Sequence, residues 1–380
     1  GMFGKSDPFL VLKRKNRDGT YVEAYKSEVV DNNLNPVWKP ISIKLSDLCN
    51  GDLDAPVRLE VWDYDSMSSN DEIGHVEVTV NQLLSKQPIK LQDHKEGRNM
   101  ECGSVQCDTC HVVRTPTFMD YLVSGCELTV SVAIDFTASN RDPSDPTSLH
   151  HVSANWNQYQ EAMIRVGEVL IEYDHDKRIA AFGFGAMLPG QKAASHCFAL
   201  NGDPANVEVD GVQGLLDAYA NCITNLKLYG PTNFAEVIAH SRMLAKEQHR
   251  QHYHVLLILT DGDITDRQQT IREIVAASQE PLSIIIVGVG EEEFADMEYL
   301  DSDKHALVDE DGKAAGRDIV QFVPFQQCKD DLEHLTLTVL KELPFQLLEY
   351  YCSKGQRPHA WGDSSPYTLP EGNWANQRHR

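Results

Sequence analysis

The chain has 380 residues, which at roughly 150 residues per domain corresponds to two or three domains, and we expect two. Its composition, 41% apolar and 24% charged, is typical of a globular protein and excludes a mainly disordered or fibrous chain. The 34 Lys and Arg residues face 57 Asp and Glu residues, which gives a formal charge of -23. Such a field repels phosphate backbones, so we expect no nucleic-acid partner, whereas surplus carboxylates can serve as metal ligands.

The sequence predicts a soluble protein of a reducing compartment. Its apolar runs are far shorter than the roughly 20 residues of a membrane span, and no secretory signal is visible at the N-terminus. Gly1 before Met2 reads as a residue left by expression. The nine cysteines are an odd and mostly scattered set, and no Asn-x-Ser/Thr acceptor occurs, so we expect cytosolic placement and mostly free thiols.

The first part of the chain predicts an antiparallel β-sandwich, because short strand-like runs are separated by turn residues and no long helix interrupts them. The expected strands are 9–15, 21–29, 40–45, 57–62 and 74–80, with one more within 103–113.

From Cys126 onward the pattern changes to apolar strands that alternate with helical segments. These strands are continuous apolar runs, which indicates a mostly parallel sheet buried on both faces, as in a doubly wound α/β domain. The expected strands are 128–136, 179–184, 254–260, 282–289 and 322–325, and the expected helices are 157–173, 212–225, 234–247, 267–278 and 330–351. We therefore expect domains at 1–113 and 114–352, followed by an irregular or disordered tail at 353–380.

Three carboxylates lie close together on one loop of the sandwich. Asp63, Asp65 and Asp71 fall between two strand-like runs, and like charges this close favour a bound cation such as Ca²⁺, which takes six to eight hard oxygen ligands. Spacing alone leaves open the alternative that they are merely solvated, because acidic loops are common on protein surfaces.

The surrounding segments resemble a C2 domain. They are Gly4 to Leu10, with its Ser-Asp-Pro, and Asn32 to Trp38, which flank the acidic loop in the family's order. The resemblance implies that Asp7, Asp63, Asp65 and Asp71 match four of the usual five calcium ligands, while the fifth position falls on Gly1. It also implies that the first strands of the family fold are missing, and hence that calcium-driven membrane docking is weak. The basic run from Lys13 to Arg17 is either a lipid-facing patch or only a solvated face.

A second group of oxygen ligands follows the strands of the α/β part. Asp135 ends one strand and is followed by Thr137 and Ser139, Asp261 follows a second strand, and Thr232 stands directly before a helix. Ligands of open α/β sheets bind at this carboxyl edge. Two carboxylates with three hydroxyls suit Mg²⁺ or Mn²⁺. Taken singly, each residue is better explained as a cap or turn residue.

Together the three segments resemble the metal-ion-dependent adhesion site of von Willebrand factor A domains, with Thr137 in place of the commoner serine. Further segments resemble the copine family, namely 132–140, 183–186, 229–234, 284–290 and 317–325. The resemblance covers residues 2–352 and implies a second C2 domain, N-terminally shortened, followed by an A domain.

The copine resemblance implies a calcium-dependent phospholipid-binding adaptor in membrane trafficking and signalling. It would bind anionic membranes peripherally and recruit acidic protein partners through the A-domain metal, moving from the cytoplasm to the plasma membrane, with the nucleus as a further location. We expect no enzymatic activity. Two alternatives stay open: a metal-dependent hydrolase, and a structural interaction module with an empty metal site.

The cluster Cys102, Cys107, Cys110 and His111 imitates ferredoxin, haem and zinc patterns. The surrounding sequence supports neither a ferredoxin nor a haem protein. A zinc site at these four residues stays open as a less favoured alternative, because no second cysteine pair lies at finger spacing. The resemblance instead implies a last sandwich strand in which Cys107 and Cys110 face opposite sides.

Overall fold

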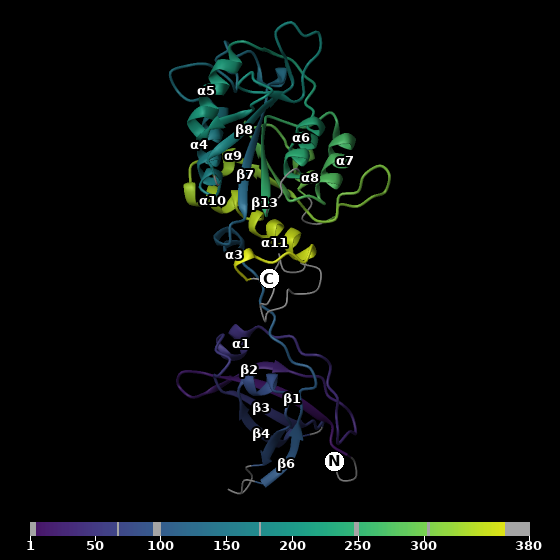
Figure 1. The fold of residues 1–380 in the computed structure, drawn as a ribbon. Helices are drawn as coiled ribbons and strands as arrows, with labels where there is room; N and C mark the ends of the chain where they lie inside the picture. The colour runs from purple at the N-terminus through teal and green to yellow at the C-terminus, as the bar shows by residue number, and fades with distance from the viewer. Residues whose placement is uncertain are drawn as a thin grey trace. The chain divides into compact units, whose positions relative to one another are not determined.

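The computed structural model describes residues 5–66, 68–93, 100–174, 176–246, 251–301 and 305–361. Two expectations lie outside these ranges. One is the fifth calcium-ligand position, which falls on Gly1, and the other is the part of the expected tail at residues 362–380. The chain divides into two compact units, Gly1–Val112 and Val113–Arg380 (Figure 1).

The first unit is an antiparallel sheet of six strands in the order β2-β1-β3-β4-β5-β6. The strands are β1 (Pro8–Lys15), β2 (Tyr21–Lys26), β3 (Val57–Asp63), β4 (Asp71–Val78), β5 (Ile89–Asp93) and β6 (Met100–Val105). Two five-residue helices, α1 (Leu45–Cys49) and α2 (Val80–Leu84), connect them. Its core gathers apolar side chains of β1 and β3, among them Leu10, Leu12, Leu59 and Val61.

Two expectations for this unit are wrong. Residues 40–45 do not form a strand: Pro36 and Pro40 lack ladder donors, and the N–H of Lys39 is given to Oε1 of Glu28 at 2.7 Å. The last strand ends at Val105, so Cys107 and Cys110 lie beyond it and do not occupy opposite faces of a strand.

The second unit is built on a sheet of order β10-β8-β7-β13-β14-β15, in which β11 also pairs with β8. The five central strands are parallel, and only β10 and β11 run antiparallel to β8. The strands are β7 (Glu127–Asp135), β8 (Arg178–Phe184), β10 (Phe198–Ala199), β11 (Glu208–Asp210), β13 (His252–Thr260), β14 (Leu282–Gly288) and β15 (Val320–Pro324). A separate ribbon pairs β9 (Ala186–Met187) with β12 (Lys227–Leu228). The antiparallel β unit followed by a doubly wound α/β unit confirms the predicted fold class.

Helices cover both faces of this sheet (Figure 1). They are α3 (Phe118–Val123), α4 (Gln158–Ile171), α5 (Gly211–Ile223), α6 (Ala235–Lys246), α7 (Arg267–Ala277), α8 (Ala295–Leu300), α9 (Phe325–Cys328), α10 (Leu332–Val339) and α11 (Leu343–Ser353). Short 3-10 turns lie at Ala138–Asn140 and His359–Trp361. The single helix expected at 330–351 is wrong: Pro344, in the first turn of α11, starts a new helix after α10. None of the helices in the described ranges is both long and apolar enough to cross a bilayer.

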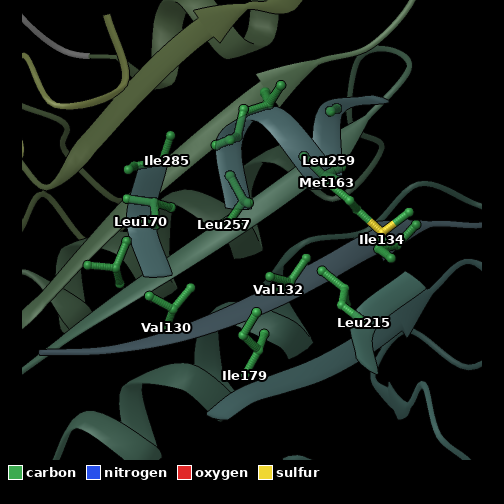
Figure 2. Close-up of a cluster of buried hydrophobic side chains, with 14 of the residues drawn as sticks. Val130, Val132, Ile134, Met163, Leu170, Ile179, Leu215, Leu257, Leu259 and Ile285 are labelled. Carbon is green, nitrogen blue, oxygen red and sulfur yellow. The ribbon is translucent and has the colours of Figure 1, made fainter. Parts of the chain in front are cut away.

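The sheet separates two apolar cores. On one face, Val132 and Ile134 of β7 and Leu257 of β13 pack against Met163 and Leu170 of α4 (Figure 2). On the other face, the core contains Ala133, Leu256 and Ile258 together with side chains of α6 and α7. Because the central strands are buried on both faces, they read as unbroken apolar runs, which is why they were predictable.

Candidate metal centre

Two carboxylates meet at the carboxyl edge of the parallel sheet. Asp135 is the last residue of β7 and Asp261 follows the last residue of the neighbouring strand β13. Both side chains lie in the interior, with 0% and 4% of their surface exposed. Thr260 donates its hydroxyl to Oδ2 of Asp135 at 2.7 Å and so links the two strand ends directly.

Hydroxyl groups bridge the two carboxylates. Thr137 donates its hydroxyl to Oδ1 of Asp135 at 2.6 Å, and Ser139 donates its own to Oδ1 of Asp261 at 3.0 Å. The two hydroxyl oxygens are 2.8 Å apart. The structure therefore joins Asp135, Thr137, Ser139 and Asp261 in one chain of oxygens.

Thr232 lies on a third loop between these two strand ends. Tyr229 pairs with Thr137 across an isolated parallel bridge, which holds the loop beside the Asp135 segment. The carbonyl of Thr232 accepts the N–H of Thr265 at 2.8 Å, which ties the loop to the segment after Asp261. The bonds that tie Thr232 to Thr265 are accepted by its carbonyl, whereas the other four predicted residues are joined through their side chains.

Behind the site, His150 supports the backbone of Asp135. Its Nε2 donates to the Asp135 carbonyl at 2.8 Å, and its Nδ1 accepts the Tyr219 hydroxyl at 2.7 Å. Burial lowers the pKa of His150 to about 3, so the ring is neutral, as this arrangement requires. Sequence reasoning missed His150, because its role depends on a contact that no motif encodes.

Gly185, which follows the last residue of β8, allows the close approach of this segment to the loop that carries Thr137. A Cβ on Gly185 would lie 2.3 Å from Cγ2 of Thr137, and the residue has φ +79, a conformation that favours glycine. The tight contact fixes the position of the Thr137 side chain.

The electrostatics of the pair favour a cation. Burial is the main cause of the raised pKa of both carboxyl groups, and the charge of Asp135 adds to it at Asp261, whose pKa rises to about 7. The Thr137 hydroxyl donates its proton to Asp135, and the Ser139 hydroxyl donates its proton to Asp261. When both carboxylates are ionised, no proton is left for the contact between the two hydroxyl oxygens. A dication at these facing oxygens would relieve both problems, and the all-oxygen donor set fits Mg²⁺ or Mn²⁺.

The acidic residues of the first unit lie where β1, β3 and β4 meet. Pro8 pairs with Asp63, which pairs on its other side with Asp71, and the N–H of Asp7 is donated to Oδ1 of Asp63 at 2.6 Å. Asp65 lies on the loop between β3 and β4, where its Oδ2 accepts the Ser68 hydroxyl at 2.8 Å. Register thus brings Asp7, Asp63 and Asp71 to one end of the sheet, with Asp65 on the adjoining loop.

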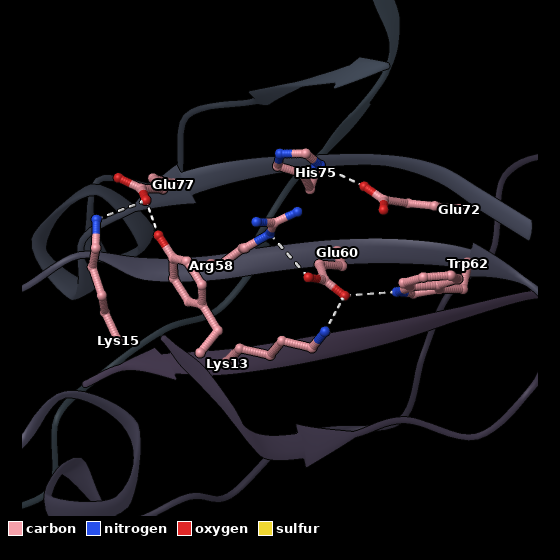
Figure 3. Close-up of polar contacts among 9 residues, drawn as sticks. Lys13, Lys15, Arg58, Glu60, Trp62, Glu72, His75 and Glu77 are labelled. Carbon is pink, nitrogen blue, oxygen red and sulfur yellow. Dashed lines mark hydrogen bonds and ion pairs between the residues drawn. The ribbon is translucent and has the colours of Figure 1, made fainter. Parts of the chain in front are cut away.

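Two of the four basic residues in the run from Lys13 to Arg17 pair with carboxylates, namely Lys13 and Lys15 (Figure 3). Lys13 lies 2.8 Å from Oε2 of the buried Glu60, which Arg58 and Trp62 also contact. Lys15 pairs with Glu77 at 3.1 Å. These ion pairs reduce the net positive charge that the run presents.

Sequence reasoning also missed an acidic triad formed by Asp301, Asp318 and Glu342, whose carboxylate oxygens lie within 4.8 Å of one another. Asp301 accepts the N–H of Phe322, and Asp318 accepts that of Val320. These bonds fix the entry into β15, and only the fold brings the three distant segments together.

Comparison with known proteins identifies the family. A family model described as Copine matches residues 148–359, which is more than half of the chain, and one described as C2 domain matches residues 1–95. The chain belongs to the copine family. A solved structure titled BON1-C2B is 34% identical, covers 27% of this copine chain and is itself 74% covered, with a TM-score of 0.25.

Two further solved structures resemble the copine chain more distantly. Manganese-loaded TRAP protein from Plasmodium vivax is 10% identical over 55% of this chain and 74% of its own, with a TM-score of 0.35. Proximal thread matrix protein 1 from the mussel byssus, with a zinc-occupied MIDAS motif, is 15% identical over 56% of this chain and 46% of its own, also at 0.35. At these TM-scores neither likeness bears on the site.

Proposed function

We propose that this copine chain is a calcium-dependent phospholipid-binding adaptor whose α/β unit recruits protein partners through a divalent metal. The observation that supports the divalent metal is the chain of oxygens between Asp135 and Asp261, in which three contacts share two hydroxyl protons. The proposed ligands of Mg²⁺ or Mn²⁺ are Asp135, Thr137, Ser139, Thr232 and Asp261.

The same site favours an acidic partner. Only two of the five proposed ligands carry a full negative charge, so a bound dication keeps part of its positive charge. A carboxylate from a partner protein is a hard oxygen ligand that would compensate it. Ser139 is exposed, which leaves the site accessible from solvent.

For the first unit, we propose that Asp7, Asp63, Asp65 and Asp71 hold Ca²⁺. Without the ion these carboxylates repel anionic lipid, and with it the local potential changes sign and lipid phosphate can complete the coordination. This is a change of charge that needs no change of fold. We accordingly place the protein in the cytoplasm, with calcium-dependent recruitment to the plasma membrane, and expect a nuclear pool as well.

The metal-dependent hydrolase is the less supported alternative, because it needs a general base beside the metal. Both ring nitrogens of His150 are engaged, by the Asp135 carbonyl and the Tyr219 hydroxyl, and its low pKa makes it a poor base. The other alternative is an interaction module that binds no metal. A calorimetric titration of the chain with Mg²⁺ or Mn²⁺ that shows no binding would support it.

Membrane binding is tested by co-sedimentation with phosphatidylserine vesicles at low and high calcium. We expect weak calcium-dependent pelleting of the wild type, and the double variant Asp63→Asn with Asp65→Asn should lose it. A matched control, Asp18→Asn with Asp54→Asn, removes the same charge from exposed residues outside the acidic loop and should pellet as the wild type does. Equal pelleting of both variants contradicts the calcium assignment.

Partner recruitment is tested by capture in Mg²⁺, elution with EDTA and identification of the eluted proteins. Wild type and the Asp261→Asn variant serve as parallel baits. Partners of the metal site should elute from the wild type and be absent from the variant. Proteins retained equally by both baits, or resistant to EDTA, count against recruitment through the metal.

A further inference from the structure

A groove on the second unit lies between α5 and the edge of the sheet. It has a volume of about 910 Å³, within the range of specific ligand sites. Its floor is apolar and includes Phe198, Leu200, Val209 and Ala218, all of which are largely buried. One wall is the edge strand β10, and the other is α5. We call it the α5 groove.

The charged side chains that line the α5 groove are all negative. Its lining includes Asp210 and Asp217 but no lysine, arginine or histidine among the described residues. Asp210 is paired with Arg178 at 3.0 Å. Asp217 is exposed and accepts an N–H from the neutral amide of Gln213 at 2.9 Å, so this bond leaves its charge uncompensated. An occupant that complements the groove is apolar where it meets the floor and cationic at Asp217.

The described lining of the groove offers no reactive nucleophile. Cys222 lines it, but burial raises the pKa of this thiol to about 12, so it is protonated at neutral pH. An occupant is therefore held without a covalent bond.

We propose that the α5 groove binds an extended peptide segment of a partner, in which a large apolar side chain lies next to a lysine or arginine. The apolar side chain fills the floor, and the cation faces the carboxylate of Asp217. Because an exposed ion pair is weak, Asp217 mainly orients the segment while the apolar contact holds it. None of these contacts involves the proposed metal ligands, so the site acts independently of the metal.

The test uses fluorescence anisotropy with the full chain at 0.15 M salt in EDTA. The probe is a fluorescein-labelled eight-residue peptide of alternating lysine and leucine. It should bind, and two matched peptides, with glutamate for lysine or serine for leucine, should bind at least tenfold more weakly. Binding that requires Mg²⁺ would assign the peptide to the metal site and overturn the proposal.

Two pairs of variants locate the binding. Asn221→Trp covers the groove from an exposed position of its lining, whereas Ala220→Trp places the same side chain on an exposed position outside it. Asp217→Lys reverses the charge at the groove, and Glu168→Lys does so on an exposed position of α4. Asn221→Trp and Asp217→Lys should weaken binding at least fivefold, while both controls should stay within twofold of the wild type.

Three further outcomes overturn the proposal. Equal loss in Asp217→Lys and Glu168→Lys would mean that the peptide responds only to the net negative charge of the chain. Full binding by Asn221→Trp would place the peptide elsewhere. Displacement of the peptide by octylamine at equal concentration would assign the groove to a small amphipathic amine.

Discussion

The hydroxyl oxygens of Thr137 and Ser139 lie 2.8 Å apart, although each directs its proton to a carboxylate. Three contacts in the chain from Asp135 to Asp261 thus share two hydroxyl protons. The chain needs either a third proton, which the raised pKa of Asp261 favours, or a cation. The second solution makes the site a metal centre.

The variant Asp261→Asn should abolish Mg²⁺ and Mn²⁺ binding, measured by isothermal titration calorimetry, because it removes one of two charged ligands. Its metal-free fold should be at least as stable as the wild type, since the variant also removes a buried charge that Asp135 repels. The exposed Asp142→Asn is the control. An unchanged titration of Asp261→Asn would contradict the ligand set.

Replacing Gly185 by alanine should weaken Mg²⁺ binding at least tenfold, because the new methyl group displaces the Thr137 side chain. Gly190→Ala is a matched control: it has the same φ of +79, yet its Cβ would meet nothing within 4 Å. Both variants place an alanine at the same positive φ, so a difference in metal affinity reports the contact with Thr137. Equal affinities would show that the loop tolerates the shift.

Titration of the buried His254 should contribute to a loss of stability of the second unit in acid. Burial, and then the charges of His252 and His240, lower the pKa of His254 to about 3, and its ring contacts Thr129 and Ser131. Its contribution is present above pH 6.5, the ordinary value, and is lost as the pH falls toward 3, by roughly 1.4 kcal/mol per pH unit. Urea unfolding between pH 7 and 4 measures this slope.

The variant His254→Gln should lower stability at pH 7, because it disturbs one buried and one partly buried hydrogen bond. It should also flatten the slope by close to one proton. The exposed His305→Gln should leave the slope unchanged. A variant slope as steep as that of the wild type would show that other groups cause the acid sensitivity.

Leu257→Ala should destabilise the second unit by about 3 kcal/mol, because Leu257 is fully buried in the core against α4 and its removal leaves a cavity. Leu337→Ala removes the same atoms from a side chain that is 66% exposed and should change stability by less than about 0.5 kcal/mol. Urea unfolding compares the two, and similar losses would contradict the assigned core.

The sequence predicted those features of the fold that depend on a single strand or helix. Strands such as β7 and β13 are buried on both faces, so each one appears in the sequence as an unbroken apolar run. These runs predicted the strands and placed Asp135 and Asp261 at their carboxyl ends. Residues 40–45 have the composition of a strand but no partner strand to pair with, and pairing is a property of the fold. Contacts between distant loops, such as that of His150 with the Asp135 carbonyl, follow from packing and leave no pattern in the chain.

The strand that carries Asp135 is shared by both apolar cores. β7 pairs with β8 on one side and β13 on the other, and its residues Val132 and Ala133 face opposite cores. Its amide hydrogens should therefore exchange with solvent only when the whole unit unfolds, and they should be among the slowest of the domain. Local opening at the surface would leave this strand in place, so at least one half of the oxygen cluster is anchored to the last part of the unit to open.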